Sequence, residues 1–221
     1  MVEVEPNNIV PGITEGEYHL KPYSQRRGEW GKTLSLTYST FDPIHYGTAF
    51  NAGLFDQVYG VPTMPLLELY FGVKRNLAWG SLGGELAAGA YENQSSEPTI
   101  VNSTLNLYPV RLGVTLALDA ISREPWFVPY VSGGLYEIFF KESLAGSSFH
   151  GNTQAAPYIH GGIALCLDWI DRHAARIAYR DSGIESSFLL LEARKQFAST
   201  VNRDPDFSND VSFAAGLRVE F

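Results

Sequence analysis

The side chains that could carry out chemistry are few, and none stands in a recognised catalytic arrangement. His160 lies six positions before Cys166, the only cysteine. Such a pair without a third, orienting group is more typical of packing than of nucleophilic catalysis. One cysteine also excludes an internal disulfide and a cysteine-cluster metal site. With no Gly-x-Ser-x-Gly elbow and no glycine-rich phosphate loop, we predict no catalytic residues, no metal site and no cofactor.

Charge and composition restrict the class of protein further. The 221 residues carry 16 Lys and Arg against 24 Asp and Glu, which gives a net charge of -8. The sequence therefore shows no basic patch of the kind that binds nucleic acid. The acids of Asn202–Asp210 alternate, but the stretch lacks the glycine and terminal glutamate of an EF-hand loop, so we interpret it as a solvated turn. A hydrophobic content of 45% excludes disorder. No window of 18 apolar residues predicts a membrane helix, and the first residues do not read as a signal peptide.

Alternation of apolar and polar residues is the main structural signal. In Asp210–Phe221, every second residue from Val211 to Phe221 is apolar or alanine, and the residues between them are small or polar. A period of two marks a strand between two different environments. Seven further segments alternate in the same way: Trp30–Phe41, Pro65–Arg75, Trp79–Asn93, Ser103–Asp119, Phe127–Lys141, Pro157–Ile170 and Ser186–Phe197.

A terminal strand that alternates and ends on an aromatic residue resembles the assembly signal of bacterial outer-membrane β-barrels, in particular the small OmpA/OmpW-like barrels. The connections agree, since short turns at Arg75–Trp79 and Asp119–Trp126 contrast with long loops such as Phe41–Pro65 and Phe197–Asp210. The resemblance implies an all-β, eight-stranded antiparallel transmembrane barrel over residues 30–221, with short periplasmic turns, longer outer loops and both termini periplasmic. Residues 1–29 would form an N-terminal periplasmic extension.

Two sets of residues are the candidate site of such a barrel. The tryptophans and the last residue fall at one end of their strands, as in an aromatic girdle at the membrane interface: Trp30, Trp79, Trp126, Trp169 and Phe221. Ionisable residues on the face opposite the apolar one predict an ionic network in the lumen: Glu68, Lys74, Glu85, Arg111, Glu137, Glu192, Arg194 and Arg218. The lumen of eight strands is narrow enough for side chains to fill, and buried charges there must be paired.

In two of the predicted strands, short stretches of sequence decide which residues are assigned to the lipid face and which to the lumen. In Ser103–Asp119, Leu105 and Leu107 are out of phase with the lower residues, so we predict a bulge at Pro109. In Phe127–Lys141, we place Tyr130, Gly134, Tyr136, Ile138 and Phe140 on the lipid side and Glu137 in the lumen.

Three other segments leave alternatives open. Tyr18–Trp30 is basic and aromatic, and either packs at the barrel mouth or lumen or forms a disordered tail. The aromatic loop Phe41–Pro65 folds over the mouth or extends the strands. Asp171–Gly183 predicts a short helix that stacks Arg172, Arg176 and Arg180, either on lipid headgroups or cell-wall polymer or as a solvated turn.

The function that these features favour is a non-enzymatic outer-membrane barrel with a structural or surface-interaction role through its outer loops. The alternative is a narrow pore, a proton path or an OmpW-like conduit for small molecules. A soluble lipocalin-type carrier and a lipid-modifying enzyme rank lower, because the polar face carries few charges and no suitable Ser/His arrangement occurs. The resemblance implies outer-membrane lipid, lipopolysaccharide and the barrel-assembly machinery as partners.

Overall fold

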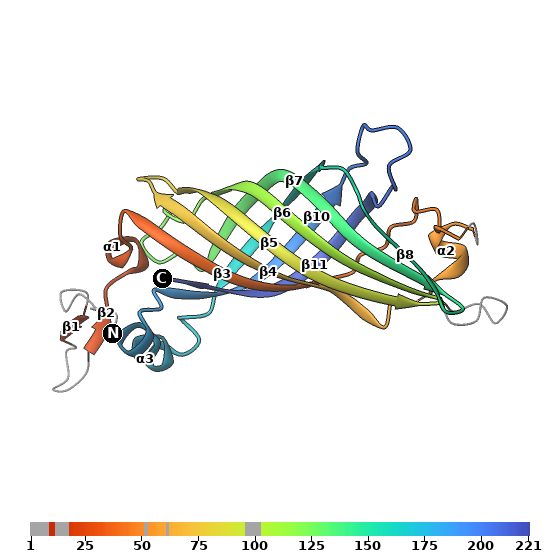
Figure 1. Ribbon diagram of the computed structural model, residues 1–221. Helices are drawn as coiled ribbons and strands as arrows, with labels where there is room; N and C mark the ends of the chain where they lie inside the picture. The colour runs from red at the N-terminus through yellow and green to blue at the C-terminus, as the bar shows by residue number, and fades with distance from the viewer. Residues whose placement is uncertain (1–8, 12–17, 51–52, 61, 96–102) are drawn as a thin grey trace.

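Eight antiparallel strands close into one barrel in the computed structural model, which describes residues 9–11, 18–50, 53–60, 62–95 and 103–221 (Figure 1). The barrel strands are β3 (Trp30–Ser39), β4 (Met64–Asn76), β5 (Ser81–Gln94), β6 (Thr104–Ala117), β7 (Phe127–Leu144), β9 (Ala156–Cys166), β10 (Ser186–Gln196) and β11 (Asn209–Glu220). Neighbours in sequence are neighbours in the sheet, β11 pairs with β3, and β6 pairs with β7 to complete the ring. The predicted all-β, eight-stranded antiparallel barrel is confirmed.

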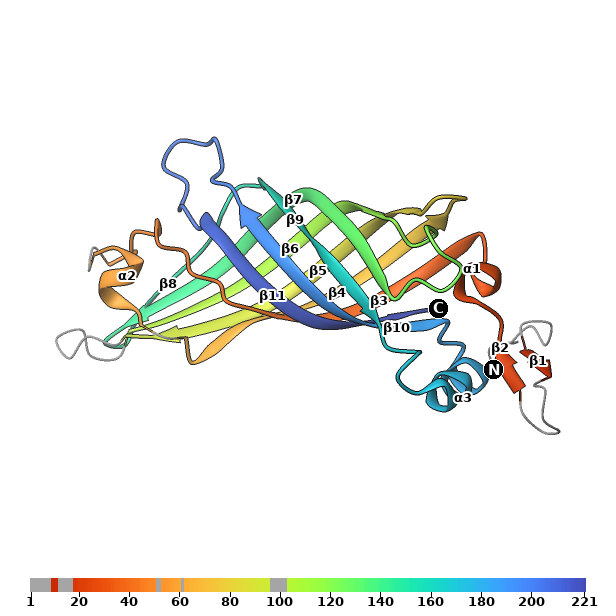
Figure 2. The same cartoon turned by 180° about the vertical axis from the view of Figure 1, so that it is seen from behind.

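The two ends of the barrel differ in how they are covered (Figures 1 and 2). The C-terminus, α1 (Tyr23–Arg26), α3 (Arg172–Ser182) and the ribbon of β1 (Ile9–Pro11) and β2 (Tyr18–Leu20) lie at one end, which we call the terminal rim. The opposite end, the loop rim, carries α2 (Phe55–Val58) and the longer connections. Residues 1–8 and 12–17 of the predicted extension, and most of the loop between Asn93 and Ser103, lie outside the described residues.

An additional strand forms in the connection between β7 and β9. β8 (Ser147–Asn152) pairs with the far half of β7, from Phe139 to Leu144, above the point where β9 takes over that edge. The turn between them uses Ala145 and Gly146, both at positive φ. The wall at the loop rim is therefore taller on this side of the barrel.

The helix predicted over Asp171–Gly183 is present as α3. The Asp171 carboxylate accepts a hydrogen bond from the Ala174 backbone N–H at 2.9 Å, and Gly183 ends the helix in the left-handed conformation at φ 68°. Within the residues that the structure describes, no helix is long and apolar enough to span a membrane.

The outer surface of the barrel is a belt of exposed apolar side chains. Leu69, Leu112, Val114, Leu191 and Leu217 are each between 49% and 66% exposed. Their neighbours along each strand are buried or half-buried inside the barrel. Six of the predicted strand phases are as expected, including that of Asp210–Phe221, because there the interior is polar or small and the exterior apolar.

The predicted bulge at Pro109 is wrong. β6 pairs with both neighbours in one register over its full length, and Leu105 and Leu107 point inward with no exposed surface. What changes along β6 is the chemistry of its inner face, which becomes apolar toward the loop rim. Bulges occur instead in β4, between Met64 and Leu67, and in β10, between Arg194 and Gln196.

The predicted phase of β7 is also wrong. Tyr130, Tyr136, Ile138 and Phe140 are buried inside the barrel, whereas Phe127, Val131, Leu135 and Phe139 are the exposed residues. The same inversion places Glu137 on the outer side, where its carboxylate accepts a hydrogen bond from the Asn152 side chain of β8 at 2.8 Å. Glu137 is therefore not part of a lumen network.

Candidate functional site

Six ionisable side chains meet across the middle of the lumen and form what we call the ionic layer: Glu68, Glu85, Arg111, His160, Glu192 and Arg194. Glu68 is the hub, because one carboxylate oxygen accepts from Arg111 Nε at 2.6 Å and the other accepts from Arg194. Arg194 also donates to Glu192 at 2.6 Å and to the Thr37 hydroxyl at 2.9 Å. All six side chains are buried, so each charge depends on its neighbours for compensation.

His160 joins two carboxylates of this layer. Its Nδ1 lies 3.3 Å from Glu192 and its Nε2 lies 3.0 Å from Glu85. A neutral imidazole has one donor nitrogen, so two ionised carboxylates are both satisfied only by the protonated ring. The layer has three carboxylates and two guanidiniums, and a protonated His160 makes it neutral.

Hydroxyl groups complete the hydrogen bonding of the carboxylates. Glu85 accepts from Ser132 at 2.5 Å, Thr115 at 2.6 Å and Tyr158 at 3.1 Å. Glu192 accepts from Tyr130 at 2.5 Å. Small residues leave room for these long side chains; at Gly89, for example, a Cβ atom would stand 2.6 Å from Glu68 Cγ. The glycines of the inner face thus have a packing role.

A second group of charges closes the terminal rim, and we call it the inner-end cluster: Tyr23, Arg27, Lys74, Ser81, Asp119 and Glu220. Lys74 Nζ donates to Glu220 at 2.8 Å and to Asp119 at 2.9 Å. The Tyr23 hydroxyl donates to Glu220 at 2.6 Å, which fixes α1 in the mouth of the barrel. Of the alternatives for Tyr18–Trp30, the structure therefore places α1 at the mouth.

Burial and nearby charges shift the pKa values of Tyr23 and Asp119 in this cluster, and of Glu185 outside it. Burial, reinforced by Glu220 and Asp119, raises the pKa of Tyr23 well above its ordinary value. Burial alone would raise the pKa of Asp119, but Lys74, Ser81 and Arg27 outweigh it, so the pKa is lowered. Glu185, in the connection before β10, has a raised pKa because of burial and the nearby Glu220 charge.

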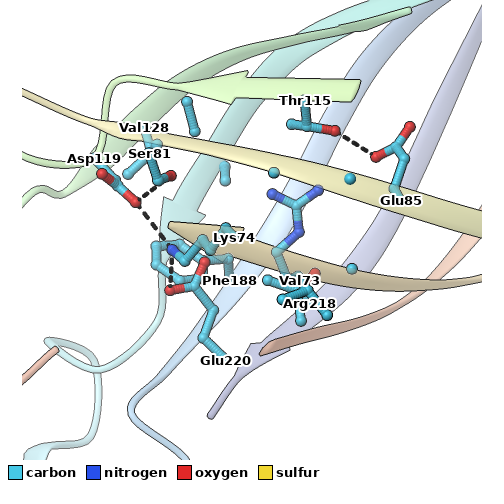
Figure 3. A pocket seen from close by; sticks show the side chains of 16 residues that line it. Val73, Lys74, Ser81, Glu85, Thr115, Asp119, Val128, Phe188, Arg218 and Glu220 are labelled. Atoms are coloured by element: carbon cyan, nitrogen blue, oxygen red, sulfur yellow. Dashed lines mark hydrogen bonds and ion pairs between the residues drawn. The ribbon is translucent and has the colours of Figure 1, made fainter. Parts of the chain in front are cut away.

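A small cavity of about 40 Å³ separates the inner-end cluster from the ionic layer (Figure 3). Lys74, Asp119 and Glu220 line one side, and Glu85 with Thr115 lines the other. Arg218 stands between them, donates to Ser35 at 3.1 Å and lies 4.8 Å from the centre of the Tyr130 ring. This volume accommodates a few water molecules among polar groups, as buried sites of this kind usually do.

The outer half of the lumen is filled by a third group, the outer cap, in which residues of the Phe41–Pro65 loop and Phe207 enter the barrel mouth: Phe41, Tyr46, Phe55, Val58, Tyr59 and Phe207. They pack on inward residues of the wall, including Leu105, Leu107 and Phe140. Tyr46 stacks on Phe207 at 4.2 Å between ring centres. The described part of this loop therefore folds into the mouth rather than extending the strands.

One buried carboxylate fixes the outer cap. Glu142 of β7 accepts from the Ala49 backbone N–H at 2.7 Å, the Tyr46 hydroxyl at 2.8 Å and the Tyr59 hydroxyl at 2.9 Å. Both phenols have a raised pKa because of burial and the adjacent Glu142. Three donors from one loop thus converge on a single wall residue.

The predicted girdle residues all lie at the terminal rim with exposed side chains. The exposed fraction is 61% for Trp30, 52% for Trp79, 66% for Trp126, 49% for Trp169 and 40% for Phe221. Trp126 and Trp169 stack at 5.4 Å between ring centres.

The predicted lumen residues divide into separate groups. Glu68, Glu85, Arg111, Glu192 and Arg194 lie in the ionic layer, Lys74 belongs to the inner-end cluster and Arg218 lies between them. The sequence reasoning missed Tyr23, Asp119, Glu220 and Glu142 as network members, and it treated His160 as packing. The inward phase of β11 included Glu220, so that residue could have been found from the alternation.

The charged groups of the lumen form ion pairs and hydrogen bonds with one another. No group of three or more metal-binding side chains occurs among the described residues. Cys166 faces Ser186 at 3.6 Å.

Comparisons with known proteins show the fold. No family model matches the chain, and no curated protein matches it in sequence. The structure is similar to the outer membrane protein OprG from Pseudomonas aeruginosa, with 13% identity, a TM-score of 0.54 and coverage of 87% of this chain and 95% of that one. Neisserial surface protein A aligns at 13% identity and a TM-score of 0.49, covering 88% and 98% of the two chains. The chain thus has the architecture of small bacterial outer-membrane barrels.

Proposed function

We propose that this protein is a non-enzymatic outer-membrane barrel whose lumen is closed by its own side chains, and that it serves a structural or surface-interaction role through its outer loops. One observation carries the proposal: the lumen is filled at three successive levels by the inner-end cluster, the ionic layer and the outer cap. An eight-stranded barrel is narrow enough for side chains to fill.

The outer surface supports a place in a lipid bilayer. A continuous belt of exposed leucine, valine and phenylalanine side chains would cost free energy in water and none in hydrocarbon. The tryptophans at the terminal rim suit a headgroup region. In this proposal the terminal rim and residues 1–29 are periplasmic and the loop rim faces outward, toward lipopolysaccharide. The alternating β11 would be the strand that the assembly machinery receives.

The ionic layer has a structural role in this proposal. Its carboxylates and guanidiniums come from β4, β5, β6 and β10. The Arg194–Glu68 and His160–Glu85 pairs join strands that are not neighbours in the sheet, whereas Arg194 and Glu192 both lie on β10. Removing one partner from a buried network of this kind typically costs several kcal/mol, because the remaining charge is left uncompensated.

A narrow pore or conduit is the second candidate, and one feature favours it. A cleft of about 530 Å³ opens at the loop rim between β3, β4 and the outer cap, lined by residues such as Tyr38, Phe41, Asp42 and Tyr59. Passage from this cleft to the terminal rim would require the outer cap, the ionic layer and the inner-end cluster all to move.

Single-channel recording in planar bilayers separates the two functions. We expect no openings from the purified barrel, and none from a Glu142→Ala variant, because the ionic layer still blocks the lumen behind the loosened cap. Steady wild-type conductance would favour the pore. Openings only in Glu142→Ala would place the single barrier at the outer cap and contradict the three-level closure.

A further inference from the structure

A groove of about 390 Å³ lies at the terminal rim between the N-terminal segment and α3. Its walls are Leu20, Pro22, Arg26, Glu124, Trp126, Asp168, Trp169, Arg172 and Ala175. The volume is within the range of ordinary ligand sites. The exposed, stacked indoles of Trp126 and Trp169 form one side, where the apolar belt ends.

The four charged residues of the groove fall into two kinds. Arg26 and Asp168 are bound to each other at 2.7 Å, and Asp168 also accepts from the Ser186 hydroxyl and the Ser187 backbone N–H. The side chains of Arg172 and Glu124 have no hydrogen bond or ion pair with any other residue that the structure describes. The groove therefore presents one cation and one anion without ionic partners.

We infer that this groove binds the headgroup of a zwitterionic phospholipid that carries a primary ammonium, of the phosphatidylethanolamine type; the inference rests on the proposed membrane location. Arg172 on α3 suits the phosphodiester, because a guanidinium binds phosphate oxygens through paired N–H donors. Glu124, in the β6–β7 turn, suits the ammonium, whose N–H groups donate to a carboxylate.

The surroundings match the rest of such a lipid. Trp126 and Trp169 suit the glycerol and ester region, where amphipathic indoles are favoured. Phe127 and Ile163 continue the exposed apolar surface away from the groove, at 58% and 44% exposure, and would contact the acyl chains. A purely anionic headgroup would satisfy Arg172 but leave Glu124 beside a negative charge.

Lipid retention by the intact barrel tests the inference. Protein inserted in nanodiscs of phosphatidylethanolamine, phosphatidylcholine and phosphatidylglycerol is extracted in mild detergent, and bound lipids are counted by native mass spectrometry. We expect phosphatidylethanolamine to be retained over the other two. Arg172→Gln should lower its retention roughly fivefold, as for the loss of one partly exposed ion pair. Glu124→Gln should remove the preference over phosphatidylcholine, whose quaternary ammonium has no N–H donor.

Arg180→Gln is the matched control, since Arg180 is on the same helix, outside the groove and paired with Asp181 at 2.7 Å. It should leave retention unchanged. Equal retention of all three lipids by an inserted wild-type barrel would overturn the site. An equal loss of retention in Arg180→Gln and Arg172→Gln would overturn it as well. A preference for phosphatidylglycerol would contradict the assignment of Arg172 to the phosphate and Glu124 to the ammonium. Failure to insert into any bilayer would instead contradict the proposed function.

Discussion

The two ends of this lumen are closed by opposite kinds of chemistry. At the terminal rim, α1 is held by charged groups, with Lys74 between Asp119 and Glu220. At the loop rim, the outer cap is an aromatic cluster in which Glu142 is the carboxylate that receives the loop's donors. The difference indicates that one barrel wall can support both an ionic closure and an aromatic one, and that the ionic layer divides them.

The largest expected effect comes from removing the cation of the inner-end cluster. Lys74→Met leaves Asp119 and Glu220 buried with less compensation, so we expect it to lower the unfolding free energy by about 3–5 kcal/mol, the range for a broken buried ion pair. Urea unfolding in lipid vesicles, followed by tryptophan fluorescence, measures this change.

Arg75→Gln is the control for that experiment, because Arg75 is the next residue of β4 and its ion pair with Glu29 is more than half exposed. It should change the unfolding free energy by less than about 1 kcal/mol. Equal effects of the two variants would show that Lys74 contributes no more to the unfolding free energy than an exposed ion pair does.

The outer cap should respond to Glu142→Ala with a smaller and local effect. The variant leaves the donors of Tyr46, Ala49 and Tyr59 without their acceptor, which costs about 1–3 kcal/mol for a buried unsatisfied group. Hydrogen exchange should speed up at the Ala49 amide, with no change around α1. Glu137→Gln, on the outer side of the same strand, serves as the comparison, and similar exchange in both variants would argue against the role of Glu142.

The smallest effects concern pH at the terminal rim, where two carboxyl groups have opposite shifts. The pKa of Asp119 is lowered from 3.8, so its stabilisation is present above that value and is lost as the pH falls through the lowered pKa. The pKa of Glu185 is raised from 4.5, so its contribution is present in acid and is lost as the pH rises through the raised pKa.

Unfolding free energies measured across pH would separate the two groups. Asp119→Asn should reduce the loss of stability in acid, and Glu185→Gln should stabilise the barrel at neutral pH but not near pH 4. A Glu185→Gln variant that is less stable than wild type at pH 7 would contradict the burial cost assigned to this carboxyl.

Alternation predicted the barrel because most strands separate a polar interior from an apolar exterior. It failed where that contrast disappears. In β7, Tyr136 and Ile138 inside are as apolar as Leu135 and Phe139 outside, and a period of two does not say which set is which. The same cause explains Leu105 and Leu107, which read as a phase change although β6 is regular.

The candidate site could be predicted only where its residues belonged to alternating strands. Glu68 and Arg194 were found because each stands on the polar face of a clear strand. Tyr23 could not be assigned, because its partner Glu220 is 197 residues away and only the closed ring brings them together. Glu142 lies in β7, the strand whose inner and outer faces were predicted the wrong way round. The sequence pattern therefore did not indicate that Glu142 is buried under the loop.

The height of β7 has a further consequence for how this molecule is built. Its 18 residues exceed the 9–11 that a tilted strand needs to cross hydrocarbon, so in the proposed membrane location the part that pairs with β8 would stand clear of the bilayer. Inside this extended part of the wall, Phe207 and Tyr46 contact Phe140. In the proposed membrane location, this extended part of the wall would therefore be filled by the protein's own aromatic side chains rather than by lipid.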